Sequence, residues 1–385
     1  MPKVLLKDVV ARIKDKVDKD NTDLKYYIGG EHFDSGEIQI TKKGIIKEST
    51  IGPAFHMRFQ PGDVLLMSRN PHLRKAGIVD FEGICSDVSY VCRTKDENVL
   101  MQRFIPFIFQ TDHFWKFAEE NKKGSTNFFL NWSDFEKYEF ELPQIDEQKK
   151  LCEMMWAFED TKSAYKDLLL QTDELVKSQF IEMFGDPLSE NSYYKKISIL
   201  DACDNITGGG TPSKKHPEYY EGNIPWVSPK DMNTSIIEDS QDHITEEAIT
   251  KSTTKLIPEQ SVLMVIRSGV LKHDLPIAIN KVPVTINQDM KAFLVGSKII
   301  PQYLFGYFKT IEADVLRGVR AVTADNIEFK VFQERLIQIP PMGEQKKFAE
   351  FMIQTDKSKF ELKQAIEDIN NLMRVFMAQN TDKED

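Results

Sequence analysis

A segment of ten residues occurs twice in this chain, and no other feature constrains the fold as much. Leu142–Leu151 reads LPQIDEQKKL, and Ile339–Phe348 reads IPPMGEQKKF. Glu147 and Glu344 occupy the same place in the two copies, which are therefore 197 residues apart. A repeat period of this length is too long for a solenoid and indicates a duplicated unit of domain size.

Each copy opens a long stretch in which apolar residues recur at three- and four-residue steps. Both stretches lack internal proline and glycine, and charged residues fill the other positions. This periodicity predicts amphipathic helices from about Asp146 to Phe184 and from about Gly343 to Ala378. Gly185 and Pro187 supply a stop for the first helix. At the usual rise per residue, each helix is about 55 Å long.

The narrow apolar stripes of these helices favour an antiparallel coiled coil that holds two globular units apart. A helical hairpin packed inside one globule is the alternative interpretation. The apolar residues predicted to pair the helices, or to dock a partner, are Leu151, Met155, Phe158, Tyr165, Leu168 and Leu175 in the first helix and Phe348, Met352, Leu362, Ile366, Ile369 and Leu372 in the second.

The repeat continues, more faintly, inside the globular parts. Asp63–Arg69 resembles Ser261–Arg267, and each reads as a short buried strand that ends at an arginine. A polar loop and a second apolar strand follow in both copies. An aromatic-rich stretch, Leu100–Phe117 in the first copy and Gln302–Leu316 in the second, is then predicted to be helical.

The sequence thus predicts an α+β protein with two α/β domains in tandem, related by a pseudo-twofold internal repeat. The two long antiparallel helices separate and bridge these domains. The predicted boundaries are 1–144 for the first domain, 145–185 for the central helix, 186–341 for the second domain, 342–380 for the distal helix and 381–385 for the tail.

The overall charge restricts how such a chain meets nucleic acid. The formal net charge is −10, which argues against nonspecific binding to nucleic acid and requires that any binding surface be locally basic. No run of about 18 apolar residues and no signal-peptide stretch is present, so we expect a cytoplasmic protein without a membrane span. The four cysteines lack zinc-ligand spacing, and we expect no metal site and no cofactor.

The loops after the two arginine-ended strands are basic in this acidic chain. The candidate DNA contacts are Arg69, His72, Arg74 and Lys75 in the first loop and Arg267, Lys272 and His273 in the second. Arginine and lysine neutralise phosphates, and arginine also makes bidentate contacts to base edges. Two ordinary solvated hairpin loops are the alternative interpretation.

A glycine-rich segment, Gly208–Pro217, offers a further candidate site. Successive glycines can cradle a phosphate with backbone N–H groups, and Lys214 and Lys215 follow them. The segment is not a Walker A loop, and a simple turn before a strand explains it equally well. Trp226 is expected in the core rather than stacked on a base. Arg317 and Arg320 form another basic spot of low specificity.

Three segments together resemble the type I restriction specificity subunits. They are Gly209–Ser213 (GGTPS), Ile224–Met232 (IPWVSPKDM) and the duplicated Pro-x-x-x-Glu-Gln-Lys-Lys. The resemblance covers almost the whole chain. The N-terminal unit lacks GGTPS, and its Tyr26–Gly36 segment resembles the opening of another subtype of target recognition domain.

The resemblance implies two target recognition domains, each of which reads one half of a split site on double-stranded DNA. It further implies that the paired helices set the gap between the half-sites, that two methyltransferase subunits dock on the chain, and that restriction subunits can join. A pseudo-twofold pair of readers suits a two-part site on duplex DNA.

Two other classes of function compete with a non-catalytic specificity subunit. A methyltransferase or endonuclease with fused recognition domains needs a catalytic region, but the two repeats fill the chain and no methyltransferase, ATPase or nuclease motif stands out. A coiled-coil scaffold that never binds DNA predicts no sequence-selective DNA affinity. We therefore expect a DNA-reading subunit without a catalytic residue.

Overall fold

The protein divides into two compact units, and each long helix contributes to both. The computed structural model describes residues 2–320 and 326–381, without the side chains of Arg320 and Thr381. One unit comprises Met1–Tyr165 with Gln364–Asp385, and the other comprises Lys166–Lys363. The predicted tail, 381–385, lies outside the described residues apart from the backbone of Thr381.

The first unit contains two four-stranded sheets, with strand orders β2-β9-β6-β7 and β4-β3-β8-β5. Its first and last strands, β1 and β10, form a separate antiparallel pair. The elements are β1 (Lys3–Leu5), α1 (Leu6–Val9), β2 (Val10–Ile13), β3 (Tyr26–Ile28), β4 (Gly44–Ile45), β5 (Phe55–Phe59), β6 (Val64–Met67), β7 (Ala76–Ile78), β8 (Gly83–Ser86), β9 (Ser89–Thr94), α2 (Ile105–Ile108), α3 (Asp112–Glu120), α4 (Trp132–Phe135), β10 (Glu139–Glu141) and the start of α5 (Ile145–Phe184).

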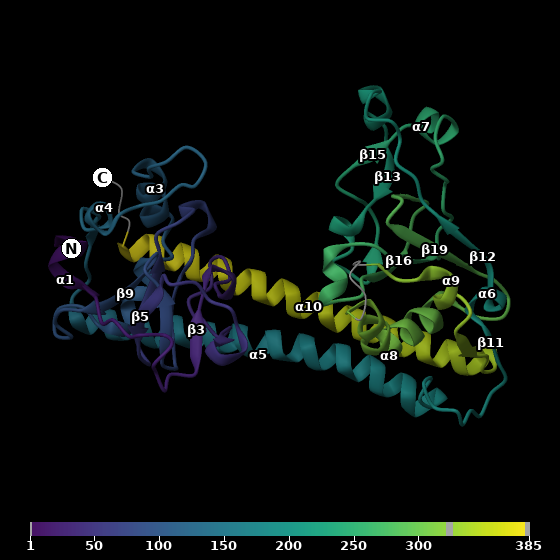
Figure 1. Cartoon of the computed structure of the whole chain (residues 1–385), viewed down its shortest axis with the longest axis horizontal. Helices are drawn as coiled ribbons and strands as arrows, with labels where there is room; N and C mark the ends of the chain where they lie inside the picture. The colour runs from purple at the N-terminus through teal and green to yellow at the C-terminus, as the bar shows by residue number, and fades with distance from the viewer. Residues whose placement is uncertain (1, 321–325, 382–385) are drawn as a thin grey trace. The chain divides into compact units, whose positions relative to one another are not determined.

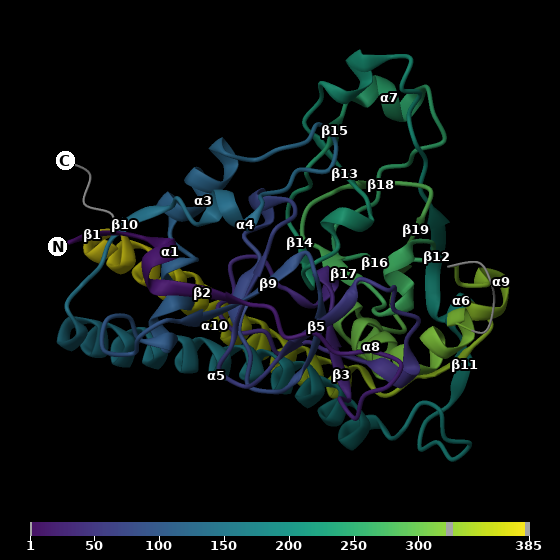
Figure 2. The same ribbon diagram turned by 60° about the vertical axis from the view of Figure 1, so that its left-hand side comes forward.

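The second unit contains a five-stranded sheet, β12-β19-β16-β17-β14, and a three-stranded sheet, β15-β13-β18. Figures 1 and 2 both show β13, β15 and α7 at the end of this unit that is remote from α8. The elements are β11 (Lys196–Ser198), α6 (Ile199–Ala202), β12 (Cys203–Gly208), β13 (Ile224–Val227), β14 (Ile236–Ile237), β15 (His243–Ile244), α7 (Glu246–Thr250), β16 (Val262–Val265), β17 (Ile277–Asn280), β18 (Thr285–Ile286), β19 (Met290–Val295), α8 (Pro301–Arg320), α9 (Phe329–Phe332), β20 (Leu336–Gln338) and the start of α10 (Met342–Thr381).

The two units share most of their strand topology, as the internal repeat predicts, although β14 adds a fifth strand to one sheet of the second unit and β5 of the first unit has no counterpart in β15-β13-β18. β11 pairs with β20 as β1 pairs with β10, and β12-β19-β16-β17 matches β2-β9-β6-β7. β3 runs parallel to β8, and β13 runs parallel to β18, so Tyr27 and Trp226 hold matching places. The first unit therefore has the same strand framework although it lacks the GGTPS segment.

The aromatic stretch Leu100–Phe117 differs from the single helix that its composition predicts. α2 ends at Ile108 and α3 begins at Asp112, because the Thr111 hydroxyl caps α3 and accepts a hydrogen bond of 3.2 Å from the Phe114 N–H. The counterpart in the second unit, Gln302–Leu316, is confirmed as helical and lies within α8.

The predicted long helices are confirmed, with each end within a few residues of its expected place. α5 and α10 each have 40 residues, or about 60 Å at the usual rise per residue. In the first unit, Leu151 and Met155 of α5 share a core with Ile369 and Met377 of α10. The early part of one helix thus meets the late part of the other, so the pairing is antiparallel (Figure 1).

The same arrangement recurs in the second unit with the two helices exchanged. There Val176, Phe180 and Phe184, near the end of α5, pack with Phe348 and Met352, near the start of α10. The rings of Phe180 and Phe348 meet edge to face, with centroids 5.4 Å apart.

Three of the predicted helix-pairing residues do not lie in these seams. Leu168, Leu175 and Leu372 are 44%, 51% and 55% exposed. Spacing of three and four residues marks an apolar face wider than the line along which two helices touch, so residues at its edge stay exposed. Phe158, Tyr165, Leu362 and Ile366 are half-buried, whereas Leu151, Met155, Phe348, Met352 and Ile369 are buried.

The duplicated glutamine of each repeat joins its long helix to the domain that precedes it. Gln148 is fully buried, donates to the carbonyls of Val99 (2.8 Å) and Pro143 (2.9 Å), and accepts from the Met101 N–H (3.0 Å). Gln345 makes the same three contacts, to Lys298 (3.0 Å), Pro340 (2.9 Å) and Ile300 (3.0 Å). The repeated glutamine thus anchors the start of each long helix to a loop of the preceding domain, and we call this set of contacts the glutamine bracket.

Replacing Gln148 with alanine leaves the carbonyls of Val99 and Pro143 and the N–H of Met101 without the partner that the glutamine supplies. We expect the free energy of unfolding to fall by about 2–3 kcal/mol, measured by urea denaturation. Gln354→Ala, an exposed glutamine on α10, is the control and should change stability by less than about 0.5 kcal/mol. Equal stability of Gln148→Ala and the parent would show that the bracket does not stabilise the fold.

Candidate nucleic-acid interface

The first basic loop, Arg69–Lys75, connects β6 to β7 and is held in a defined shape. Pro71–Leu73 forms a single 3₁₀ turn, and the flanking residues Asn70 and Arg74 adopt left-handed backbone angles, with φ of 52° and 47°. The Asn70 N–H donates to the Phe128 carbonyl at 2.9 Å. The loop is therefore anchored to the segment before α4 and presents its side chains from a fixed backbone.

The four candidate side chains of this loop differ in availability. Arg69 and His72 are exposed. Arg74 forms an ion pair of 2.5 Å with Asp112, and the Lys75 ammonium donates to the Gly30 carbonyl at 2.6 Å. Arg69 and His72 are therefore the stronger candidates for contact with a ligand.

The second basic loop, Arg267–His273, connects β16 to β17. Its 3₁₀ turn, Gly269–Lys272, is capped by Ser268, whose hydroxyl accepts from the Val270 N–H at 3.4 Å. Arg267 is 64% exposed, and its guanidinium lies 3.7 Å from the Asp289 carboxylate. Lys272 and His273 are exposed as well. This loop thus presents all three of its candidate side chains at the surface.

The two loops occupy matching positions in their units. Leu130 N–H donates to the Ser68 carbonyl at 2.8 Å, and Ile327 N–H donates to the Ile266 carbonyl at 2.8 Å. Isolated β-bridges join Arg69 to Phe129 and Arg267 to Asn326. Each loop therefore emerges beside the segment that leads into α4 or α9.

The glycines of the GGTPS segment are required by close packing between backbones. The segment connects β12 to β13, and a Cβ on Gly209 would lie 2.0 Å from the Ile286 carbonyl oxygen. The Gly210 N–H donates to that same oxygen at 3.0 Å, and its carbonyl accepts from the Trp226 indole at 3.0 Å. A Gly210 N–H engaged in this way favours the interpretation as a turn over a phosphate cradle.

Trp226 lies in the core, as expected, where it packs with Tyr219, Ile244 and Ala248. GGTPS and IPWV therefore contact one another within the second unit.

The remaining basic candidates lie at the surface of the second unit. Lys214 and Lys215 are exposed in the turn after Gly210. Arg317 on α8 is 71% exposed and lies 3.0 Å from Asp314, which also pairs with Arg335 at 2.7 Å. The side chain of Arg320 lies outside the described residues.

Sequence reasoning missed a groove of about 760 Å³ beside the second loop, lined by His273, Arg317 and the lysines 177, 309, 359 and 363. The groove also carries carboxylates, among them Glu312, whose pKa is raised chiefly by burial. The Leu275 N–H donates to Glu312 at 2.8 Å. The mixture of charges distinguishes this groove from a purely basic nucleic-acid channel.

Other kinds of site find little support in the described part of the chain. Residues 2–320 and 326–381 hold no cluster of three or more histidine, cysteine, aspartate or glutamate side chains arranged to bind a metal. No helix in the same ranges is long and apolar enough to cross a membrane. All four cysteines are buried and unpaired, and burial raises the pKa of the Cys152 and Cys203 thiols to about 12.

The fold and the paired loops define a tandem of two recognition domains on shared helices. Residues 3–171 and 191–371 both match the type I restriction modification DNA specificity domain, so most of the chain is matched. The chain belongs to this family and carries two copies of the domain.

Curated relatives match part of the chain. It is 41% identical over 152 residues to the EcoR124I/EcoR124II specificity subunit of Escherichia coli, which covers 39% of this chain and 38% of the relative. It is 29% identical over 160 residues to the MjaIX specificity subunit of Methanocaldococcus jannaschii, which covers 40% and 35%. The matched part thus spans less than two-fifths of the length of these relatives.

Solved structures match the whole chain in fold. A chain from a study of complex assembly and conformational transition of the type I R-M system matches with a TM-score of 0.57 at 17% identity, covering 98% of this chain and 97% of that one. The type I restriction-modification S subunit from M. genitalium matches with a TM-score of 0.53 at 11% identity, covering 100% and 96%.

The packing of Gly209 can be tested by one methyl group. Gly209→Ala places a Cβ against the Ile286 carbonyl, and we expect it to lower the stability of the second unit by at least about 2 kcal/mol. Gly269→Ala, where nothing lies within 4 Å of the added Cβ, is the matched control and should unfold like the parent. A fully stable Gly209→Ala protein with weakened DNA binding would instead favour the phosphate cradle.

Proposed function

We propose that this chain is the DNA-reading specificity subunit of a type I restriction–modification complex, acts in the cytoplasm and catalyses no reaction itself. The observation that carries the proposal is the duplication. Two domains with a shared strand framework each present an exposed basic loop at the same place, and both belong to a DNA specificity family. A protein of this kind reads two half-sites of one split sequence on double-stranded DNA.

The local charge of the loops supports DNA as the ligand in spite of the acidic total. Arg69 and His72 in the first domain and Arg267, Lys272 and His273 in the second are exposed on short, anchored turns. Arginine at such a place contacts phosphates or reads guanine through its two acceptors in the major groove. The subunits that join the complex supply further phosphate contacts.

The two long helices support a fixed spacing between the half-sites. Each is continuous for 40 residues, and the apolar residues that pair them are buried in both units. A helix pair without an internal break is a stiff connector. We infer that it sets the number of base pairs between the two recognised halves.

Exposed apolar residues on the same helices support docking of two methyltransferase subunits. Leu175 on α5 and Leu372 on α10 hold matching places in the repeat and are 51% and 55% exposed. A duplicated surface on a pseudo-twofold scaffold offers two equivalent docking sites. Restriction subunits then join the complex of specificity and methyltransferase subunits.

Methylation mapping tests the proposed function. With its methyltransferase co-expressed, the parent chain should direct methylation to one split, asymmetric motif, read by sequencing at single-base resolution. Arg267→Ala should weaken selection of bases in one half of that motif by about 1–3 kcal/mol, equivalent to roughly 5- to 150-fold, and leave the other half unchanged.

Lys281→Ala is the control for Arg267→Ala. Lys281 is an exposed cation at the opposite end of β17 from the loop, where it pairs with Glu238 at 2.8 Å. We expect it to leave the motif intact. Methylation that is unchanged by the chain, with an active methyltransferase, would contradict the proposed function. Uniform weakening by Arg267→Ala across unrelated sequences would reassign that arginine to phosphate contact.

Lengthening both helices tests the spacing role. Seven residues inserted between Tyr165 and Lys166, with seven more between Lys363 and Gln364, add about 10 Å while nearly preserving the helical phase. The preferred spacer should lengthen by about three base pairs, at 3.4 Å per base pair. Seven residues inserted after Glu190, outside both matched domains, should leave the spacer unchanged. An unaltered preferred spacer in the variant with lengthened helices would contradict the proposal that the helices set the distance between the half-sites.

A further inference from the structure

An acid–lysine pair is repeated on the two long helices, 197 residues apart. Glu159 and Lys162 lie on α5, and Asp356 and Lys359 lie at the corresponding positions on α10. In each pair the two side chains are three residues apart, so they share one face of the helix. Each pair faces the recognition domain of its own unit, as the contacts below establish.

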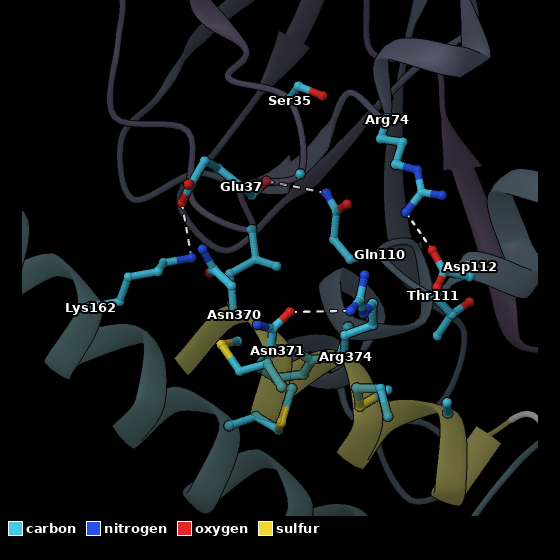
Figure 3. A pocket seen from close by; sticks show the side chains of 17 residues that line it. Ser35, Glu37, Arg74, Gln110, Thr111, Asp112, Lys162, Asn370, Asn371 and Arg374 are labelled. Carbon is cyan, nitrogen blue, oxygen red and sulfur yellow. Dashed lines mark hydrogen bonds and ion pairs between the residues drawn. The ribbon is translucent and has the colours of Figure 1, made fainter. Parts of the chain in front are cut away.

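In the first unit the pair is almost fully buried and reaches into the recognition domain. Glu159 and Lys162 are 3% and 2% exposed, and the Lys162 ammonium lies 2.6 Å from the Glu159 carboxylate. The same ammonium lies 3.0 Å from Glu37, which belongs to the loop before β4 (Figure 3). Lys162 therefore bridges a carboxylate of the long helix and a carboxylate of the domain.

In the second unit the corresponding pair makes a weaker contact. Ser235 donates to the Asp356 carboxylate at 3.1 Å, and burial is the main cause of the raised pKa of Asp356. Lys359 turns to Asp173 on α5 instead of reaching the domain. A single hydroxyl thus takes the place of the ion pair that joins helix and domain in the first unit.

The domain segments that meet these pairs are equivalent. The Ile78 N–H donates to the Ile38 carbonyl at 2.8 Å, and the Ile279 N–H donates to the Ser235 carbonyl at 2.9 Å. Both segments therefore lie along the outer strand of the hairpin that follows a basic loop, β7 or β17. We call 36–38 and 234–236 the edge segments.

A cavity lies beside part of the edge segment of the first unit. The cavity has a volume of about 270 Å³ and is lined by Ser35, Gln110, Met155, Asn370 and Arg374 (Figure 3). Ile38 of the segment belongs to the apolar core that also holds Met155 and Met377, so beside the cavity the segment contacts the helices through Ile38 and through the ion pair of Glu37 with Lys162. The larger groove of the second unit holds Ser235 and Lys359 at the corresponding place.

We propose that Glu37, Glu159 and Lys162 form a positioning cluster that fixes the angle of the first recognition domain on the helix pair, and that the Ser235–Asp356 contact holds the second domain less firmly. A buried lysine that satisfies two carboxylates has one favourable geometry, since any displacement leaves a charge unpaired and dehydrated. A hydroxyl beside a partly solvated groove tolerates displacement.

The consequence for DNA rests on the proposed function. A domain held at one angle meets its half-site only when the two halves have the correct separation and helical phase. A domain that can change its angle on the helices also reaches half-sites at slightly shorter or longer separations. Its effective concentration is then distributed over several separations instead of being highest at one.

The experiment removes the two almost fully buried charges of α5 together, so that neither is left without the other, while Glu37, whose side chain is 23% exposed, keeps contact with solvent. Glu159→Leu with Lys162→Met replaces the pair by apolar side chains of similar length, a change that buried ion pairs tolerate. Asp146→Asn with Lys149→Met, an exposed pair on the same helix with a 3.5 Å separation, is the matched control. Asp356→Leu with Lys359→Met is the corresponding change in the second unit.

Binding of each complex with methyltransferase is measured on the preferred site and on sites with the spacer one base pair longer or shorter. We expect Glu159→Leu/Lys162→Met to lose about three- to tenfold of its discrimination between spacers. Discrimination between bases inside each half-site should stay unchanged, since no reading residue is altered. Asp356→Leu/Lys359→Met should lose less than about twofold of its discrimination between spacers, and the control Asp146→Asn/Lys149→Met should keep the discrimination of the parent.

Two results overturn the proposal. One is a folded Glu159→Leu/Lys162→Met protein with the spacer discrimination of the parent. The other is loss of base selection in the first half-site with spacer discrimination intact. If Glu159→Leu/Lys162→Met does not fold, Glu37→Gln tests the proposal in the same assay, because it removes only the ion pair between Lys162 and the domain.

Failure of the proposed function is recognised separately, because the parent complex would then select no split site. In that event the positioning cluster is tested by hydrogen exchange of the edge segment, measured on the chain with its methyltransferase. Exchange at residues 36–40 should be faster in Glu37→Gln than in the parent, and equal rates overturn the positioning cluster.

Discussion

The buried glutamines Gln148 and Gln345 are the contacts on which the rest of the architecture depends. Each satisfies backbone groups of a loop while it sits in the first turn of a long helix, so the start of that helix is fixed to its domain. An apolar side chain would leave three backbone groups without this partner, so each position favours a side-chain amide, which both donates and accepts. The antiparallel pairing of the two helices rests on a different set of contacts, the apolar residues that both helices contribute to the core of each unit.

The duplication and the two long helices were predictable because each produces a regular pattern in the sequence. The spacing of Glu147 and Glu344 gave the duplication, and the three- and four-residue steps gave α5 and α10 almost to the residue. Patterns of this kind report which face is buried and nothing finer. They did not separate Leu168, at the exposed edge of a helix face, from Leu151 in the seam.

The candidate site was less predictable, because local charge in a sequence does not reveal its tertiary partners. Arg74 and Lys75 look as available as Arg69, yet Asp112 and the Gly30 carbonyl hold them, and both partners are distant in the chain. The Thr111 cap that divides α2 from α3 was visible only as one threonine among aromatics. Glu159, Lys162, Asp356 and Lys359 were within reach of sequence reasoning, since superposing the repeats aligns them.

The strand pairs that close each unit have an evolutionary consequence. β1 lies beside β10, and β11 lies beside β20, so the chain enters and leaves each recognition domain at adjacent points. Recombination between genes at these two junctions would replace everything between them, including the loop that each glutamine contacts, while Gln148, Gln345 and the paired helices stay. Because these contacts go to backbone groups of the loop, a different loop sequence can still make them. Under the proposed function, a whole domain exchanged in this way would carry a complete reading surface with it, so a new specificity would not require intermediates with an incomplete one.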